Sequence, residues 1–242
     1  MSIKVSLRFA PRWYWILIVL AVMALFVRLG LWQWQRGEYH RAQREEFTRG
    51  DAQPVEATAS SLERLPRYTR VRVGGTFDAT RQFLLENISH AGAPGYEVLT
   101  VLTLGDGSHM LVNRGWLPFS GYRDRLPDVS FDPDAAPPFL TGRLSLPPVA
   151  GLASGRVPPS NDGAWPRLAS FPTIEQLAAS YGAPLVPAML LLDADAGPGY
   201  LRDWQPPGIP PERNFSYAIQ WWSFAALALA LFVGLNLKRR HV

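Results

Sequence analysis

The stretch Tyr217–Leu237, YAIQWWSFAALALALFVGLNL, contains no charged side chain. A helix rises about 1.5 Å per residue, so about 20 residues cross the ~30 Å hydrocarbon core of a bilayer. Near the other end of the chain, Trp13–Trp34, WYWILIVLAVMALFVRLGLWQW, is interrupted only by Arg28. The two stretches predict a membrane protein with one transmembrane helix towards each end of the chain.

The first stretch could also be read as a secretory signal peptide, because basic residues precede it (Lys4, Arg8 and Arg12). In a signal peptide the apolar run is followed by a small-residue cleavage site, whereas here the run Trp13–Val27 is followed, after Arg28, by bulky Leu31, Trp32 and Trp34. The sequence therefore favours an uncleaved membrane anchor.

Lys and Arg outside the two stretches predict the orientation in the membrane. Three precede the first stretch, and three follow the second (Lys238, Arg239 and Arg240). Residues 37–214 hold sixteen Arg, no Lys and all twenty acidic residues, a net charge of −4. We predict cytoplasmic tails at 1–12 and 238–242, transmembrane helices at 13–34 and 215–237, and a periplasmic domain at 35–214. The excess of Lys and Arg therefore lies at the ends of the two membrane stretches, where it sets the orientation of the chain. Since the region between them is mildly acidic, nucleic acid is not an expected partner.

The predicted periplasmic domain reads as β-rich. Residues 36–49 favour a helical extension of the first span, and period-two patterns predict strands within 67–77, 82–88, 96–104, 109–116, 140–146 and 186–192. Thr173 and Gly182 predict the two caps of a short helix, and 147–172 reads as a loop. The fold class is α+β: an antiparallel small barrel or curled sheet with short helices, flanked by the two membrane helices.

Residue types that carry catalysis are scarce. The chain has no cysteine, which excludes disulfides, thiol catalysis and a thiolate metal site. No nucleophile elbow or phosphate loop occurs, and His40, His90 and His109 stand alone in the sequence, each expected at the surface or hydrogen-bonded. We therefore predict a protein that is not an enzyme and has no catalytic residue and no metal site.

One face of each predicted membrane helix carries aromatic, amide and guanidinium groups at the same expected depth. Helical spacing places Leu29 with Trp32, Gln33 and Arg36 on the first helix, and Asn214 with Tyr217, Gln220, Trp221 and Phe224 on the second. This layer suits a flat amphipathic molecule, with rings against Trp or Tyr and acidic groups against Arg36 or Arg28. The alternative is simple anchoring at the lipid interface, with Arg28 snorkelling outward.

Two further groups of residues are candidates for packing or support. Ala226, Ala230 and Gly234 recur every four residues and would let another helix approach, either the first span, where Gly30 lies, or a different membrane protein. In the exported domain, Arg114 and Trp116 lie at a strand end punctuated by Gly115 and Pro118, where they either hold the turn or reach towards the membrane layer.

Four ordered motifs resemble those of a known family. They are LGLWQWQR at 29–36, YEVLTVL at 96–102, VNRGWLP at 112–118 and NFSYAIQW at 214–221. The chain resembles the Surfeit-locus-one family of cytochrome c oxidase assembly factors. The resemblance implies a role in maturing haem-copper oxidase through delivery or insertion of haem a, with the oxidase catalytic subunit and haem a synthase as partners.

The chain departs from that family at two positions. Val101 replaces a proline that relatives often have, and Asn214 stands where relatives often have a histidine, the natural candidate for an axial haem ligand. An amide is a poor iron ligand, so the resemblance supplies no axial ligand at this position. The excess of Arg over Lys favours a bacterial inner membrane over a mitochondrial one. The alternative function is a two-span structural or ligand-sensing protein of a respiratory complex.

Overall fold

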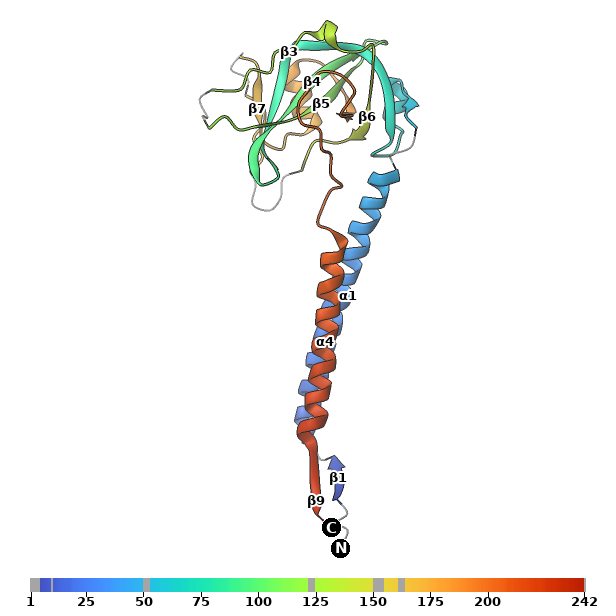
Figure 1. The fold of residues 1–242 in the computed structure, drawn as a ribbon, viewed down its shortest axis with the longest axis vertical. Helices are drawn as coiled ribbons and strands as arrows, with labels where there is room; N and C mark the ends of the chain where they lie inside the picture. Colours follow the sequence, from blue (N-terminus) through green and yellow to red (C-terminus); the bar gives the residue numbers. More distant parts are fainter. Residues whose placement is uncertain are drawn as a thin grey trace. The chain divides into compact units, whose positions relative to one another are not determined.

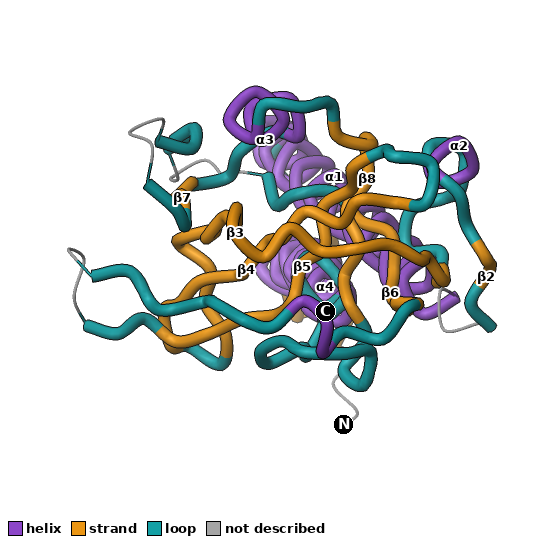
Figure 2. The backbone as a smooth tube through the Cα atoms, turned by 90° about the horizontal axis from the view of Figure 1, so that it is seen from above, coloured by secondary structure: helices purple, strands orange, loops and turns teal. Residues whose placement is uncertain are grey.

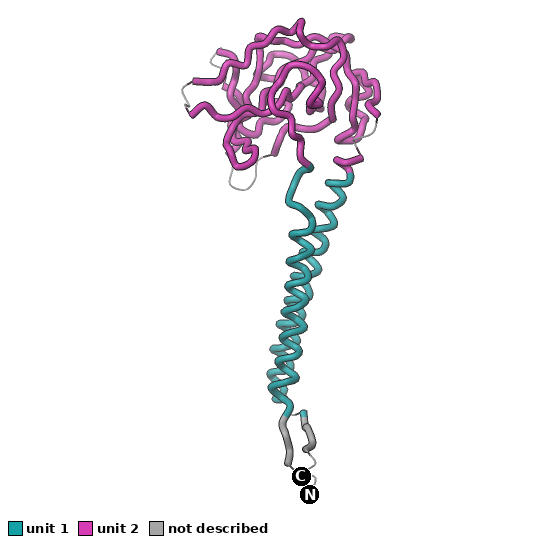
Figure 3. Tube along the Cα trace, in the orientation of Figure 1, with its two compact units in different colours: residues 1–45, 206–242 teal, residues 46–205 magenta. Residues whose placement is uncertain are grey.

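The computed structural model describes residues 5–9, 11–49, 53–121, 125–149, 155–160 and 164–241. Parts of the predicted cytoplasmic tails and of the predicted loop at 147–172 lie outside these residues. Contacts divide the chain into two compact units, Met1–Glu45 with Pro206–Val242, and Glu46–Gln205, coloured separately in Figure 3. We call the first the helical hairpin and the second the sheet domain.

The helical hairpin contains α1 (Trp13–Arg49) except its last turn, and the whole of α4 (Pro211–Asn236), and the two helices run side by side (Figure 1). Both are long and apolar enough to cross a membrane. The predicted continuation of the first helix beyond residue 36 is confirmed, whereas the membrane boundaries at 13–34 and 215–237 stay predictions. Beyond the helices, β1 (Val5–Phe9) pairs antiparallel with β9 (Leu237–His241), an interaction that the sequence did not predict.

Within its described residues, the sheet domain has seven paired strands and three short helices. The strands are β2 (Val55–Glu56), β3 (Arg70–His90), β4 (Ala93–Leu104), β5 (His109–Pro118), β6 (Phe139–Ser145), β7 (Arg167–Ala169) and β8 (Leu185–Leu192). The helices are α2 (Ala59–Leu62), α3 (Ile174–Tyr181) and the 3₁₀ helix η1 (Pro133–Ala135).

The prediction of a purely antiparallel domain is wrong, because the sheet is mixed. β4 pairs antiparallel with β3 and β5, but β5 and β8 are parallel, as are the short β2–β3 and β3–β7 pairings. Parallel neighbours need a long crossover, and η1, β6, β7 and α3 all lie between β5 and β8 in the sequence. Period-two patterns identify strands but carry no information about their direction, so the parallel pairing of β5 with β8 could not be predicted from the sequence.

The sheet curls strongly, as the view in Figure 2 shows. β6 joins β8 and also pairs with Arg70–Gly74 at the start of β3. This contact covers five residue pairs of the 21-residue β3. The structure is a strongly curled mixed sheet in which β6 bridges β8 and the start of β3, and the curled sheet is one of the two forms that the sequence predicted.

Local signals correctly predicted several elements. The side chain of Thr173 caps α3 by accepting a hydrogen bond from the backbone N–H of Gln176, and Gly182 ends the helix in the left-handed region. The predicted β4–β5 hairpin is also confirmed. The two strands predicted within 67–77 and 82–88 are instead one strand, β3, with a register shift between Phe77 and Gln82.

The core lies on both faces of the curled sheet, because β4 is buried along nearly its whole length. Leu102 and Leu104 enter one apolar cluster, whereas Leu99 and Val101 enter another, which α3 covers with Leu177. A strand buried on both faces needs cover on both sides. This explains why YEVLTVLTL has apolar residues on both alternating sets of positions.

Candidate functional site

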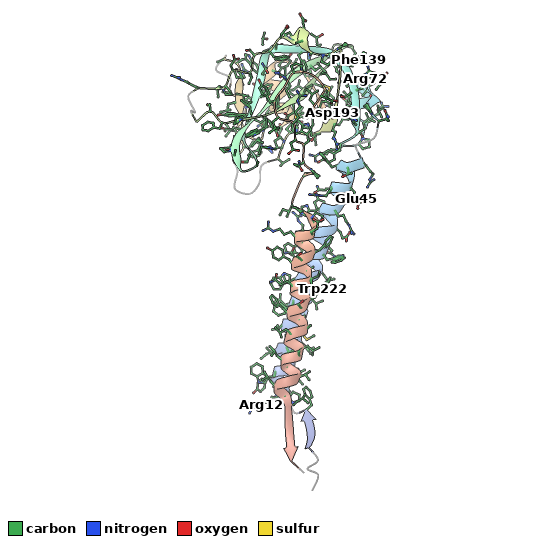
Figure 4. The ribbon with its side chains drawn as sticks, viewed as in Figure 1. Arg12, Glu45, Arg72, Phe139, Asp193 and Trp222 are labelled. Atoms are coloured by element: carbon green, nitrogen blue, oxygen red, sulfur yellow. The ribbon has the colours of Figure 1, made fainter. Side chains whose placement is uncertain are left out.

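The helical hairpin is built on a seven-residue period of glycine and aromatic residues. A Cβ placed on Gly30 would lie 2.2 Å from Trp222 Nε1, and one on Gly37 would lie 2.5 Å from Phe215 Cε1. Each glycine therefore leaves the space that the facing ring fills (Trp222 is labelled in Figure 4). Both pairs are seven residues apart, which is the spacing of a seam between two packed helices.

Aromatic contacts extend this seam on both sides. Trp34 lies 4.8 Å from Phe215 and 5.7 Å from Trp222, measured between ring centroids. On the other flank, Phe26 stacks on Trp221 at 5.7 Å. The predicted site residue Trp221 is thus a packing residue of the hairpin as well as a candidate for ligand contact.

Most of the other predicted contact residues on the helices point outward. Arg28, Trp32, Arg36, Tyr217 and Gln220 are exposed, Gln33 is half-buried and Asn214 is buried. Among the described residues no hydrogen bond or ring contact joins the predicted stripe of α1 to that of α4, and the Arg36 guanidinium lies over Tyr39, 5.5 Å from the ring centroid. Their role as a layer that binds haem or a partner stays a prediction.

The stripe Ala226, Ala230 and Gly234 does not face α1. Both alanines are exposed, and nothing lies within 4 Å of a Cβ placed on Gly234. The small residues buried on α4 are instead Ala218 and Ala225, which fit the seven-residue period. Packing of the exposed stripe against a second protein stays a prediction, whereas Gly30 lies in the seam.

His40 is the feature of the hairpin that the sequence reading missed. Its residue is 6% exposed, and its Nδ1 is buried with no hydrogen-bond partner. The ring lies against Gly208 of the segment leading into α4, since a Cβ placed there would be 2.8 Å from Nδ1. His40 is seven residues after Gln33, which is itself seven residues after Phe26, and it is one helical turn after Arg36. This spacing puts His40 on the helix face that carries Gln33 and Arg36, so the sequence could have marked it as part of that face.

In the sheet domain, Arg114 is a buried structural cation. It is 2% exposed, its Nη1 donates to Gln82 Oε1 at 3.0 Å, and its Nε donates to the Pro198 carbonyl at 3.3 Å. The guanidinium also lies 3.6 Å from the Phe131 ring centroid. Burial lowers the pKa of Arg114 to about 10.

Trp116 is likewise built into the sheet domain. Its Nε1 donates to the Ile88 carbonyl at 3.3 Å, and its ring covers Gly95, where a Cβ would lie 2.4 Å from Trp116 Cε2. Between Arg114 and Trp116, Gly115 has φ 114° and lies against the backbone of Tyr200 and Leu201. The strand-end role of this motif is thus visible in the contacts, and a role in supporting a membrane layer stays a prediction.

Glu97 is a second group that the sequence reading did not single out. Its Oε2 accepts a hydrogen bond from Asn113 Nδ2 at 2.7 Å. Burial raises the pKa of Glu97, and the Asn113 hydrogen bond only partly opposes this effect. Glu97 and Asn113 fall inside two of the quoted motifs, which indicates that those motifs mark paired β4–β5 positions.

The residue at the position where the resemblance expects an axial haem ligand does not have a suitable side chain. Haem iron takes axial ligands from His, Met, Cys or Tyr, so Asn214 does not fit that role. His40 has an unsatisfied ring nitrogen, and both residues belong to the helical hairpin. His40 is thus a buried imidazole that lies one turn beyond the exposed guanidinium of Arg36.

Comparison with protein families gives a match. The family model described as the SURF1 family matches residues 20–226. The match includes most of α1, the whole sheet domain and the first part of α4. No curated protein sequence matches the chain.

Proposed function

Because the chain belongs to the SURF1 family, the Surfeit-locus-one family of the sequence prediction, we propose that it assists delivery or insertion of haem a into the catalytic subunit of cytochrome oxidase. The family is one of assembly factors linked to cytochrome oxidase, and its match over residues 20–226 is the observation that carries the proposal. Haem a, the catalytic subunit and haem a synthase are the proposed cargo and partners.

The proposed setting is a bacterial inner membrane that α1 and α4 both cross. Residues 1–12 and 238–242 would lie in the cytoplasm and the sheet domain in the periplasm. Two apolar helices and the flanking basic residues support this arrangement. The exposed aromatic, amide and guanidinium groups of the hairpin would then contact haem or the partner at the outer membrane boundary, and the protein itself would not be an enzyme.

The test is deletion of the gene followed by complementation. We expect oxidase apoprotein to accumulate while the haem a band of the reduced-minus-oxidised membrane spectrum falls severalfold, because haem a insertion fails. Unchanged spectra in a clean deletion would contradict the proposal. Stoichiometric recovery of this chain with mature oxidase would instead support a structural subunit.

A matched pair of variants links the function to one side of α1. Arg36→Gln should complement poorly, because Arg36 is exposed within the predicted contact layer. Arg49→Gln is the control, since at 100° per residue it lies roughly 140° around the helix from Arg36. Equal complementation by both variants would argue that Arg36 only anchors the helix in lipid.

A further inference from the structure

A cavity of about 260 Å³ in the sheet domain is lined by parts of β3, β4 and β7, and β3 pairs with both of the other strands (Figure 2). Its walls include Glu86 and Asn87 of β3, Tyr96 of β4, Leu168 of β7, and Phe119, which follows β5. Pockets for drug-sized ligands measure about 300–1,000 Å³, so this one suits a single side chain. We propose that this cavity, the Glu86 cavity, binds the guanidinium of an arginine side chain that a partner protein presents. The inference goes beyond the proposed haem role and does not depend on it.

A break in the β3–β4 ladder places a carboxylate and an amide at this cavity. The register shifts between Leu85 and Ile88, which leaves Glu86 and Asn87 outside the regular pairing. Asn87 has φ 63°, in the left-handed region that asparagine adopts more readily than most residues. Irregularities of this kind redirect side chains and are frequent next to functional sites.

Ser170 fixes one oxygen of the Glu86 carboxylate. Its hydroxyl donates to Glu86 Oε1 and accepts a hydrogen bond from Asn87 Nδ2 at 2.9 Å. Ser170 is 1% exposed, and its backbone forms a bridge with Val157. Among the described residues, Glu86 Oε2 takes part in no hydrogen bond or ion pair. The carboxylate is therefore positioned by the protein, and its second oxygen is available to an outside donor.

Glu86 differs from the other half-buried acids of the sheet domain. The described residues of this domain include four such acids: Asp78, Glu86, Glu97 and Asp193. Asp78 Oδ2 lies 2.6 Å from Arg81 Nε, and Asp193 Oδ2 lies 2.7 Å from Arg70 Nη2. Glu97 accepts a hydrogen bond from Asn113. Carboxylates withdrawn from water are generally paired with a cation, whereas Glu86 has only the Ser170 hydroxyl in the described part of the chain.

The Arg81 contacts show what a carboxylate beside an aromatic ring holds in this same domain. Arg81 Nε donates to Asp78 Oδ2 at 2.6 Å, and the guanidinium lies 4.0 Å from the centroid of the Tyr181 ring. The Glu86 cavity offers the same two kinds of group, since the rings of Tyr96 and Phe119 lie 6.0 Å apart in its wall. No arginine is among the described residues that line it. The cavity thus has the partners of a guanidinium without the guanidinium.

The shape and charge of the cavity favour arginine over lysine. A guanidinium is planar, so it stacks on an aromatic face while its N–H groups donate to a carboxylate, whereas an ammonium is a strongly hydrated point charge. Asn87 and Pro94 of the lining are exposed, so a protein segment can reach the cavity from solvent. Residues 37–214 carry a net charge of −4, which attracts a basic segment.

The experiment is a ligand-observed nuclear magnetic resonance titration of the detergent-purified full chain with a blocked glycine–arginine–glycine peptide. The matched probe replaces arginine by citrulline, which keeps the shape and loses the charge. Wild type should bind the arginine peptide about tenfold more tightly. Glu86→Gln should remove this preference. Phe119→Leu should weaken binding of the arginine peptide severalfold, because the stacking surface is lost while the carboxylate remains. Unchanged urea midpoints show that both variants keep the fold.

A matched control removes an exposed carboxylate that is not among the residues lining the cavity. Glu63→Gln should bind the arginine peptide as wild type does. An equal loss in Glu63→Gln and Glu86→Gln would overturn the proposal in favour of general attraction to an acidic surface. Equal affinity of wild type for the arginine and citrulline peptides would also overturn it. Tighter binding of free arginine than of the blocked peptide would replace the protein partner by an amino acid.

Discussion

The sheet domain buries its large apolar side chains, whereas the helical hairpin leaves most of its apolar side chains exposed. In the sheet domain Leu99, Leu102 and Leu111 are fully buried. In the hairpin only 6% and 11% of the most apolar stretches of α1 and α4 are buried, and Leu31 is 50% exposed. The sheet domain can be stable in water through its own core, whereas the hairpin needs an apolar surrounding to cover its side chains.

The largest effect is expected in a test of which residues a membrane-impermeant reagent can reach from outside the cell membrane. This tests whether the hairpin crosses the bilayer and the sheet domain lies outside it. Because the chain has no cysteine, one introduced thiol is the only site for a maleimide. In spheroplasts a membrane-impermeant maleimide should label Gly105→Cys, in the β4–β5 turn, fully. It should label Arg12→Cys, just before α1, only after lysis. Equal labelling of both in intact spheroplasts would mean that the hairpin does not cross the bilayer.

A matched pair of leucines tests the energetic side of the comparison. Leu111→Ala should lower the free energy of unfolding by about 2–5 kcal/mol, since it removes a fully buried side chain from the cluster under α3. Leu31→Ala should change it by less than about 0.5 kcal/mol in detergent. Urea unfolding in micelles, followed by circular dichroism, measures both. Similar losses would show that Leu31 is covered by protein.

The seam of the hairpin can be tested with two glycines. Gly30→Leu forces a side chain into the space of Trp222 and should cost about 1–3 kcal/mol while separating the rings of Trp34 and Trp222. Gly234→Leu meets open space and is the control. The far-ultraviolet circular dichroism signal of coupled indoles should fall only in Gly30→Leu. Its persistence there would place the seam elsewhere.

The smallest expected effect is a pH dependence within the sheet domain. Burial alone would raise the pKa of Asp78, but hydrogen bonds from Thr80, Arg81 and Tyr181 outweigh it and hold the pKa at about 2. The lowered pKa means that the carboxylate stabilises the fold above its ordinary pKa of 3.8 and that this stability is lost as the pH falls through about 2.

Asp78→Asn should therefore lower the free energy of unfolding by about 1 kcal/mol at pH 6, and the difference from wild type should shrink towards pH 2. Urea midpoints at pH 6, 4 and 2 measure this convergence. Glu56→Gln is the control, because the Glu56 side chain is 81% exposed and 3.6 Å from Arg72. A difference that stays constant with pH would show that the Asp78 charge does not stabilise the fold.

Contacts between residues close in the sequence could be predicted from the sequence, whereas contacts between residues far apart could not. The caps of α3 at Thr173 and Gly182 involve neighbouring residues, so their residue types were sufficient. The parallel β5–β8 pairing joins strands separated by a long crossover, and alternation does not encode direction. The burial of His40 depends on Gly208, far along the chain, so His40 read as an isolated polar residue. Glycine-against-ring packing at Gly30 and Gly37 also needed both helices together.

The seven-residue repeat of Gly30 and Gly37 against Trp222 and Phe215 also limits how the length of α1 can change. Inserting one residue between the two glycines turns everything beyond it by about 100°, which would point Gly37 away from Phe215. An insertion of seven residues returns the second glycine to nearly the same side of the helix. The segment of α1 between the two glycines can therefore change its length by about seven residues at a time if both glycines are to stay on the same side of the helix.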